Sequence, residues 1–201
     1  MNKKLKKSLA ALRIVAAQHA YQPNSASTLL LLLSEEDLPG SGWKQSLQQT
    51  FPTGALAADD PIMARAKQMK STTARRQFGI PSSTRSLLVA IAPLASSTDA
   101  QSWVASTDER TKRNLSKIED VGEFHLIDDL SLSSVGDTSG FTDSFTRPEG
   151  ARLATVVASN VDELFMSVTG LSFEEPWSIN GILEVVQAQV DKIQVRRAAG
   201  A

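Results

Sequence analysis

The 201-residue chain has no cysteine, which excludes cysteine nucleophiles, thiolate metal sites and disulfide bonds together. It has only two histidines, so a three-histidine metal site is impossible. Aromatic residues make up 5% of the chain, which is thin for a surface that stacks bases or sugars. The formal net charge is −1, so no overall field attracts nucleic acid, and no nucleic-acid partner is expected. No run approaches the ~18 apolar residues that a membrane span needs.

The remaining composition is that of a soluble globular protein, with 41% hydrophobic and 21% charged residues. A chain of this length can bury a core without metal or disulfide support. The polar segment 22–28 is typical of a linker. We therefore predict a basic N-terminal helix or tail with its linker at residues 1–28, a single α+β domain at 29–195, and a C-terminal tail at 196–201.

The N-terminus carries five basic residues before Ser34 and no acidic residue. Three interpretations stay open: a secretory signal, a basic amphipathic helix, and a solvated helix or tail. Arg13 interrupts the apolar stretch 8–17, whereas a signal needs roughly 7–15 apolar residues. A signal would place the domain outside the cytoplasm, at the cell envelope. An amphipathic helix would instead give peripheral membrane contact or docking to a partner from the cytoplasm.

Hydrophobic periodicity and capping residues predict the elements of the domain. Ser34 with the acids after it, and Asp60 with Pro61, begin helices. A long helix is predicted over 97–115, and a strongly amphipathic one over 178–195. The predicted strands are 71–78, 87–94, 123–130, 141–145, 153–158 and 163–169. The last three are close in sequence and therefore antiparallel, which favours an α+β fold: a meandering antiparallel sheet flanked by helices, with the C-terminal amphipathic helix packed on it.

Several local patterns resemble those of soluble lipoprotein and sensor domains from actinobacterial cell envelopes. These patterns are the segment 30–40 followed by Trp43, the helix 99–115, the turn 135–137, and the hairpin 153–169 with the helix 179–193 after it. The resemblance covers roughly 29–195. It implies a PsbP-like or kinase-sensor-like α+β fold, and a binding, sensing or envelope-maintenance module without a catalytic constellation or cofactor.

Candidate catalytic and metal-binding residues are few. His125 near Asp129 could serve a hydrolase, but a strand histidine on a wet face explains it better. Asp128, Asp129 and Asp137 could hold a cation, but their spacing fits no EF-hand loop. Nucleophile-elbow, phosphate-loop and zinc-protease motifs are all missing from the sequence. We therefore expect a protein that is not an enzyme and has no catalytic residue, metal or cofactor.

Two groups of residues are the candidate binding sites. Trp43 and Trp177 border predicted loops and could rim a shallow ligand cleft, although tryptophans also seal core edges. A basic stretch could bind an anion or an acidic partner, although such a stretch is also typical of a solvated face; it comprises Arg65, Lys67, Lys70, Arg75 and Arg76.

These candidates lead to two functional hypotheses. The first is a non-enzymatic binding or sensor-like module of the cell envelope, whose partner is a small apolar or lipid-like ligand or a protein. The alternative is a cytoplasmic interaction or assembly protein that docks through its basic N-terminal helix.

Overall fold

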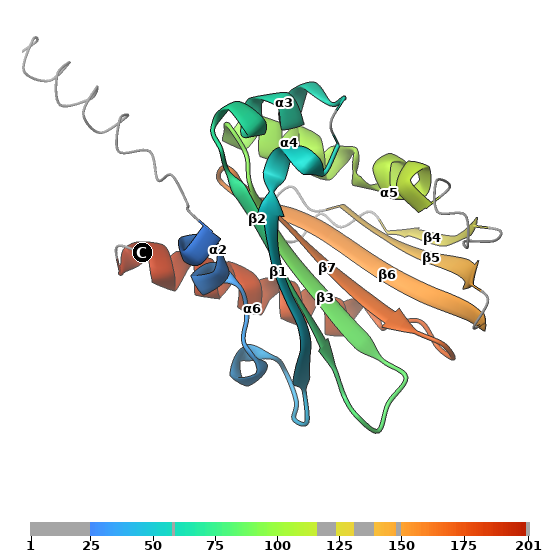
Figure 1. Cartoon of the computed structure of the whole chain (residues 1–201). Helices are drawn as coiled ribbons and strands as arrows, with labels where there is room; N and C mark the ends of the chain where they lie inside the picture. The colour runs from blue at the N-terminus through green and yellow to red at the C-terminus, as the bar shows by residue number, and fades with distance from the viewer. Residues whose placement is uncertain (1–24, 58, 116–123, 131–138, 148–149, 200–201) are drawn as a thin grey trace, which may run out of the picture.

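A seven-stranded sheet with helices on both faces forms the molecule in the computed structural model, which describes residues 25–57, 59–115, 124–130, 139–147 and 150–199. The strand order is β1-β2-β3-β7-β6-β5-β4, and every neighbouring pair is antiparallel (Figure 1). The strands are β1 (Lys44–Pro52), β2 (Thr72–Gly79), β3 (Ser86–Pro93), β4 (Phe124–Leu130), β5 (Ser139–Arg147), β6 (Gly150–Val161) and β7 (Leu164–Ser172). The predicted α+β class is confirmed, and the finer PsbP-like assignment stays a prediction.

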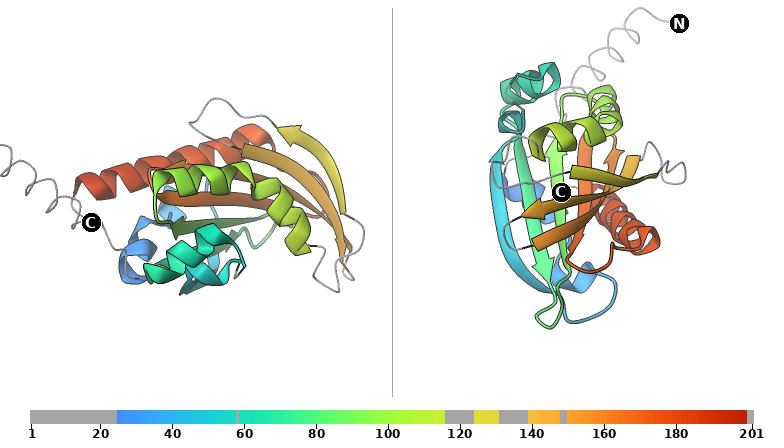
Figure 2. Two further views of the ribbon diagram at one scale, coloured as in Figure 1. Left: turned by 90° about the horizontal axis from the view of Figure 1, so that it is seen from above. Right: turned by 90° about the vertical axis from the view of Figure 1, so that its right-hand side faces the viewer.

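The helices lie in two layers, one on each face of the sheet (Figure 2). One layer contains α6 and α2, and the other contains α3, α4 and α5. Their bounds, with those of two short 3-10 helices, are α2 (Ser25–Leu31), η1 (Glu35–Asp37), η2 (Thr53–Ala55), α3 (Pro61–Gln68), α4 (Ser97–Ala105), α5 (Thr107–Leu115) and α6 (Ile179–Ala198). In the part of the chain that the structure describes, none of these helices combines the length and hydropathy of a membrane span.

The main core fills the space between the sheet and the layer of α6 and α2. Strand β3 sends Leu87, Val89 and Ile91 to this side, because alternate residues of a strand face the same way. They pack in one cluster with Ile182 and Ile193 of α6, and all five side chains are fully buried. The amphipathic stripe that predicts the C-terminal helix is therefore the stripe that contacts the sheet.

Two helical features differ from the sequence-based expectation. Helix α2 begins at Ser25, inside the predicted linker, and Thr28 is fully buried in the fold. The predicted helix 97–115 is two helices that meet at Ser106. There the Ser106 and Thr107 hydroxyls donate to the carbonyls of Ser102 and Trp103, and such hydroxyl bonds compete with the helical ladder. The N-terminal interpretations and the turn 135–137 lie outside the described residues.

The C-terminal end of α2 is bonded to α6 and β2. The Gln189 side chain is fully buried; its Nε2 donates to Leu31 O at 2.7 Å, and its Oε1 accepts from Leu33 N at 3.1 Å. Arg76 Nη1 donates to Leu33 O at 2.7 Å and to Leu32 O at 3.3 Å. These bonds satisfy carbonyls that a helix end leaves without intrahelical partners. They attach the leucine-rich segment to the fold.

One carboxylate links the segment after α2 to α6. Asp37 Oδ2 accepts from the Ser34 backbone N–H at 2.6 Å and from Lys192 Nζ. Burial acts to raise the pKa of Asp37, but the hydrogen bonds from Lys192 and Ser34 outweigh it, so the pKa lies below its usual value. A carboxyl whose pKa is lower in the folded state stabilises the fold above its unfolded pKa.

The Asp37 contribution is expected to be lost as the pH falls below about 4, the ordinary pKa range of an aspartate, and through the lower folded pKa. Asp37→Asn should therefore lower the unfolding free energy at pH 7 and flatten its decline at acid pH. Urea unfolding between pH 7 and pH 2.5 measures both effects. The exposed neighbour provides the control, Glu36→Gln; equal pH profiles for Asp37→Asn and the wild type would contradict the assignment.

Candidate functional site

A pocket of about 310 Å³ lies on the sheet face opposite α6. Its floor comes from β2, β3, β6 and β7, and its walls come from α4, α5 and the end of β1. The lining residues are Phe51, Leu56, Thr73, Arg75, Leu88, Ala90, Ala92, Trp103, Thr107, Arg110, Thr111, Ala154, Val156, Phe165, Ser167, Thr169 and Leu171. Ligand pockets typically hold 300–1,000 Å³, so this one has the size for a small ligand.

Small side chains create the hollow. In register across the sheet, Ala90 pairs with Arg75 on one side and with Ser167 on the other, and Ala92 lies two residues along the same strand. The opposite face of that strand carries the large residues of the main core. A sheet face with large aliphatic side chains would fill this space, whereas alanine and serine leave it open.

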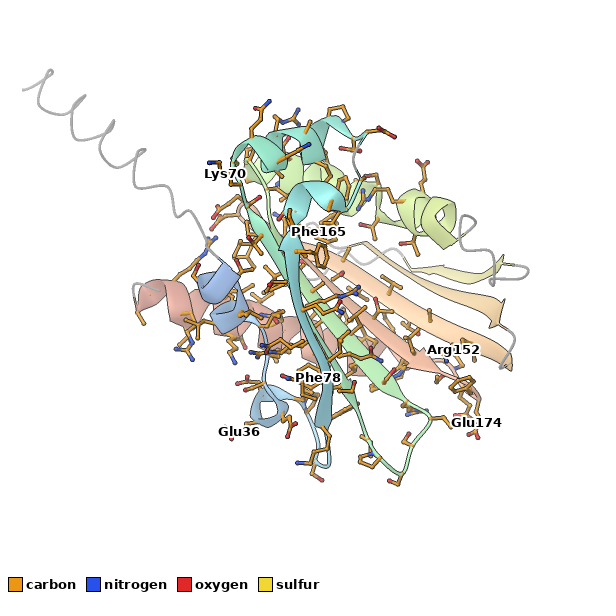
Figure 3. The ribbon with its side chains drawn as sticks, in the orientation of Figure 1. Glu36, Lys70, Phe78, Arg152, Phe165 and Glu174 are labelled. Atoms are coloured by element: carbon orange, nitrogen blue, oxygen red, sulfur yellow. The ribbon has the colours of Figure 1, made fainter. Side chains whose placement is uncertain are left out.

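The wall beneath α4 is rigid and aromatic. Trp103 meets Phe165 edge to face, with ring centroids 6.4 Å apart, and Phe165 lies on the sheet below α4 in Figure 3. The Arg110 guanidinium sits 3.5 Å from the Trp103 ring centroid and donates to the Trp103 carbonyl at 2.5 Å and to Thr107 Oγ1 at 2.9 Å. A cation over an indole ring is stabilising. Arg110 therefore ties α5 to α4 above the pocket.

The charged residues in the described lining of the pocket are both basic. Two arginines are among the described lining residues, and none of the described lining residues is an aspartate or glutamate. Arg75 Nε donates to Gln49 Oε1 at 2.8 Å, and the Arg75 Cζ lies 5.5 Å from the Phe51 ring centroid. No carboxylate of the described residues forms an ion pair with Arg75. The pocket thus offers an apolar interior with a positive group held at its β2 side.

A second hollow of about 440 Å³ adjoins the first through Phe51 and carries Lys67 and Lys70. Lys70 follows α3 with a φ of +56°; its N–H donates to Lys67 O and the next N–H donates to Ala66 O, as in a Schellman cap. Both lysines are exposed, and Figure 3 shows Lys70 at the end of α3. They extend the positive surface beside Arg75.

The five predicted basic residues do not gather in one patch. Arg65 forms an ion pair with the buried carboxylate of Asp99, with Nε donating to Oδ2 at 3.0 Å. Arg76 faces the layer of α2, where it is partly buried and burial lowers its pKa. Of these five residues only Lys67, Lys70 and Arg75 lie around the two hollows, and the anion-binding role of the full set stays a prediction.

The two predicted ligand-binding tryptophans lie on the other face of the sheet. Trp43 and Trp177 stack with ring centroids 5.8 Å apart, and both belong to the main core and its border. Trp43 Nε1 donates to Pro39 O at 2.9 Å and Trp177 Nε1 donates to Leu171 O at 3.2 Å. The two tryptophans contact each other, but neither of them lines the pocket. A ligand role for this pair stays a prediction.

The side chains of the acid–base and metal candidates lie largely outside the described residues. His125 lies in β4, where its backbone pairs with Ser144, and its side chain is outside the described residues, as is Asp137. Among the residues that the structure describes, no group of three or more histidine, aspartate or glutamate side chains could hold a metal ion.

No protein-family model matches the chain, and no curated protein matches it either. Its fold is similar to the crystal structure of the extracellular domain of PknH from Mycobacterium tuberculosis. The TM-score is 0.53 at 11% sequence identity, and the match covers 86% of this chain and 92% of that chain. At this identity the likeness shows the fold alone. It agrees with the α+β architecture that the predicted resemblance implies.

Of the described residues that line the pocket, the sequence-based binding candidates include only Arg75, although the sequence holds a signal for part of the floor. The nearly continuous apolar run 87–94 predicts a buried central strand. Within this strand the segment 89–92 alternates large residues with small ones at Ala90 and Ala92. The alternation instead marks one filled face and one hollow face, because side chains of a strand alternate between its two sides.

Proposed function

We propose that this protein is a non-enzymatic binding module that takes a small apolar ligand in the pocket between the sheet and α4–α5. The observation that carries the proposal is the cavity of about 310 Å³, which opens over small side chains such as Ala90 and Ala92 and is otherwise lined mainly by apolar residues. A few polar groups at its border, Thr73, Arg75 and Ser167 among them, can orient a ligand. A preformed apolar pocket with few polar groups is the usual form of a small-molecule site.

The similar fold of an extracellular domain supports a further part of this proposal, namely that the protein acts outside the cytoplasm. PknH contributes an extracellular domain with a similar fold. The sequence hypothesis of an envelope module agrees with this location. The binding function itself rests on the pocket.

Filling the pocket is expected to abolish apolar binding. Ala90→Phe places a ring in the hollow, where Ala90 lies between Arg75 and Ser167 in register. Nile red, whose emission rises in apolar surroundings, should bind the wild type and bind Ala90→Phe at least about tenfold more weakly, the loss expected when a pocket worth a few kcal/mol is blocked. Fluorescence titration measures the two dissociation constants.

The matched control is Ala64→Phe, which adds the same ring at an exposed position of α3 outside the lining of the pocket. It should bind Nile red as the wild type does. A thermal melt of each variant confirms that it is folded. Wild-type affinity in folded Ala90→Phe, or no binding by the wild type, would overturn the proposed function.

A further inference from the structure

We propose that the ligand of this pocket is a single-chain amphipathic anion, whose carboxylate or phosphate head binds Arg75 and whose chain lies on the small-residue floor. This inference rests on the proposed function and specifies its ligand class.

The position of Arg75 suits a head group at one end of an apolar trough. Arg75 lies on β2, directly beside Ala90 of β3, and Ser167 of β7 follows in the same row. Neighbouring strands lie about 4.8 Å apart, so Arg75 and Ser167 stand on backbones about 10 Å apart with only an alanine methyl between them. A chain entering beside Arg75 along this row therefore crosses Ala90 and then Ser167, with Leu88 on the same face of β3.

The two arginines differ in how many of their donors the protein already uses. Arg110 lies over the Trp103 ring and donates to Trp103 O, Thr107 Oγ1 and Ser106 Oγ, so its role is to hold α5 on α4. Among the described residues, Arg75 donates hydrogen bonds to the neutral side-chain amide of Gln49 alone. Gln49 fixes the guanidinium without neutralising it.

An anion complements this arrangement better than a neutral ligand does. Among the described residues that line the pocket none is acidic, so a bound carboxylate or phosphate meets no like charge from them. Arginine presents a planar fork that matches these groups, and such charge-assisted bonds are about twice as strong as neutral ones. Lys67 and Lys70 in the adjoining hollow add positive charge on the same side, next to Phe51.

Competition against bound Nile red tests the ligand class with three probes that share a twelve-carbon chain: dodecanoate, dodecyl phosphate and 1-dodecanol. For the wild type, at least one anion should displace Nile red at about tenfold lower concentration than the alcohol does, as one charge-assisted hydrogen bond predicts. Arg75→Gln should remove this preference, and Arg75→Lys should keep part of it. The measured quantity is the ratio of alcohol to anion dissociation constants.

The control is Arg196→Gln, which removes the same charge from an exposed position near the end of α6, on the far face of the sheet. It should keep the wild-type ratio. Whichever anion binds more tightly identifies the head group, and either preference supports the inference.

If the wild type binds Nile red and dodecanol displaces it at the same concentration as both anions do, the inference is overturned and the proposed function stands. An anion preference that survives unchanged in folded Arg75→Gln would overturn the assignment to Arg75. Absence of Nile red binding by the wild type would overturn the proposed function itself.

Discussion

Replacing Gln189 with leucine is expected to lower the free energy of unfolding by about 3 kcal/mol, because it leaves two buried backbone groups without a partner. Gln189 is fully buried and bonds Leu31 O and Leu33 N at the end of α2. Leucine has a similar volume, so the loss comes from the unpaired carbonyl and N–H rather than from a cavity. Urea unfolding at pH 7 measures the change.

The same substitution two residues earlier on α6 is the matched control. Gln187 is exposed, and its Nε2 donates to Asp191 Oδ1 at 2.8 Å. Gln187→Leu should change the unfolding free energy by less than about 0.5 kcal/mol, as exposed substitutions usually do. If Gln189→Leu were no more destabilising than Gln187→Leu, the buried amide would not hold α2 on the fold.

The fold class could be predicted because several local sequence patterns form the predicted elements in the structure. Ser34 with Asp37, and Asp60 before Pro61, are observed as helix starts, and Asp60 Oδ1 accepts from Ile62 N at 2.8 Å. Closely spaced strands pair antiparallel, as short connections require. The sequence predicts a linker where helix α2 begins, because the first turn of this helix is polar. What stabilises it is tertiary, namely contacts with β2 and α6 that no local window contains.

The site was harder to predict, because it depends on strand register. Arg75 and Arg76 are adjacent in sequence, yet they point to opposite faces of β2, one toward the pocket and one toward α2. Treating the basic stretch as one patch ignored this alternation. The neighbours of Ala90, in contrast, come from β2 and β7, and only the observed pairing brings them together.

The stacked tryptophans explain why a glycine stands near the end of β7. Gly170 pairs with Leu87 and Thr155 on its two sides, and the Trp177 ring lies directly over it. A Cβ built at Gly170 would be 2.5 Å from Trp177 Cγ and 2.7 Å from Ile182 Cδ1. Thr155 Oγ1 also donates to Trp177 O at 3.2 Å, so the Trp177 backbone has little freedom to retreat. A close approach of this kind admits only glycine.

Gly170→Ala is therefore expected to destabilise the fold by about 1–3 kcal/mol, the cost of overpacking a well-filled site. Gly79→Ala is the opposite case: it too is a strand glycine, but a Cβ there meets nothing within 4 Å. Alanine should be neutral or stabilising by about 0.5 kcal/mol at that position, because it reduces the entropy of the unfolded chain. Thermal and urea unfolding should show a loss of stability only for Gly170→Ala, and displacement of Trp177 from its stack should shift tryptophan emission only in that variant. If both alanines have the same small effect, the ring does not rest on the strand as the structure places it.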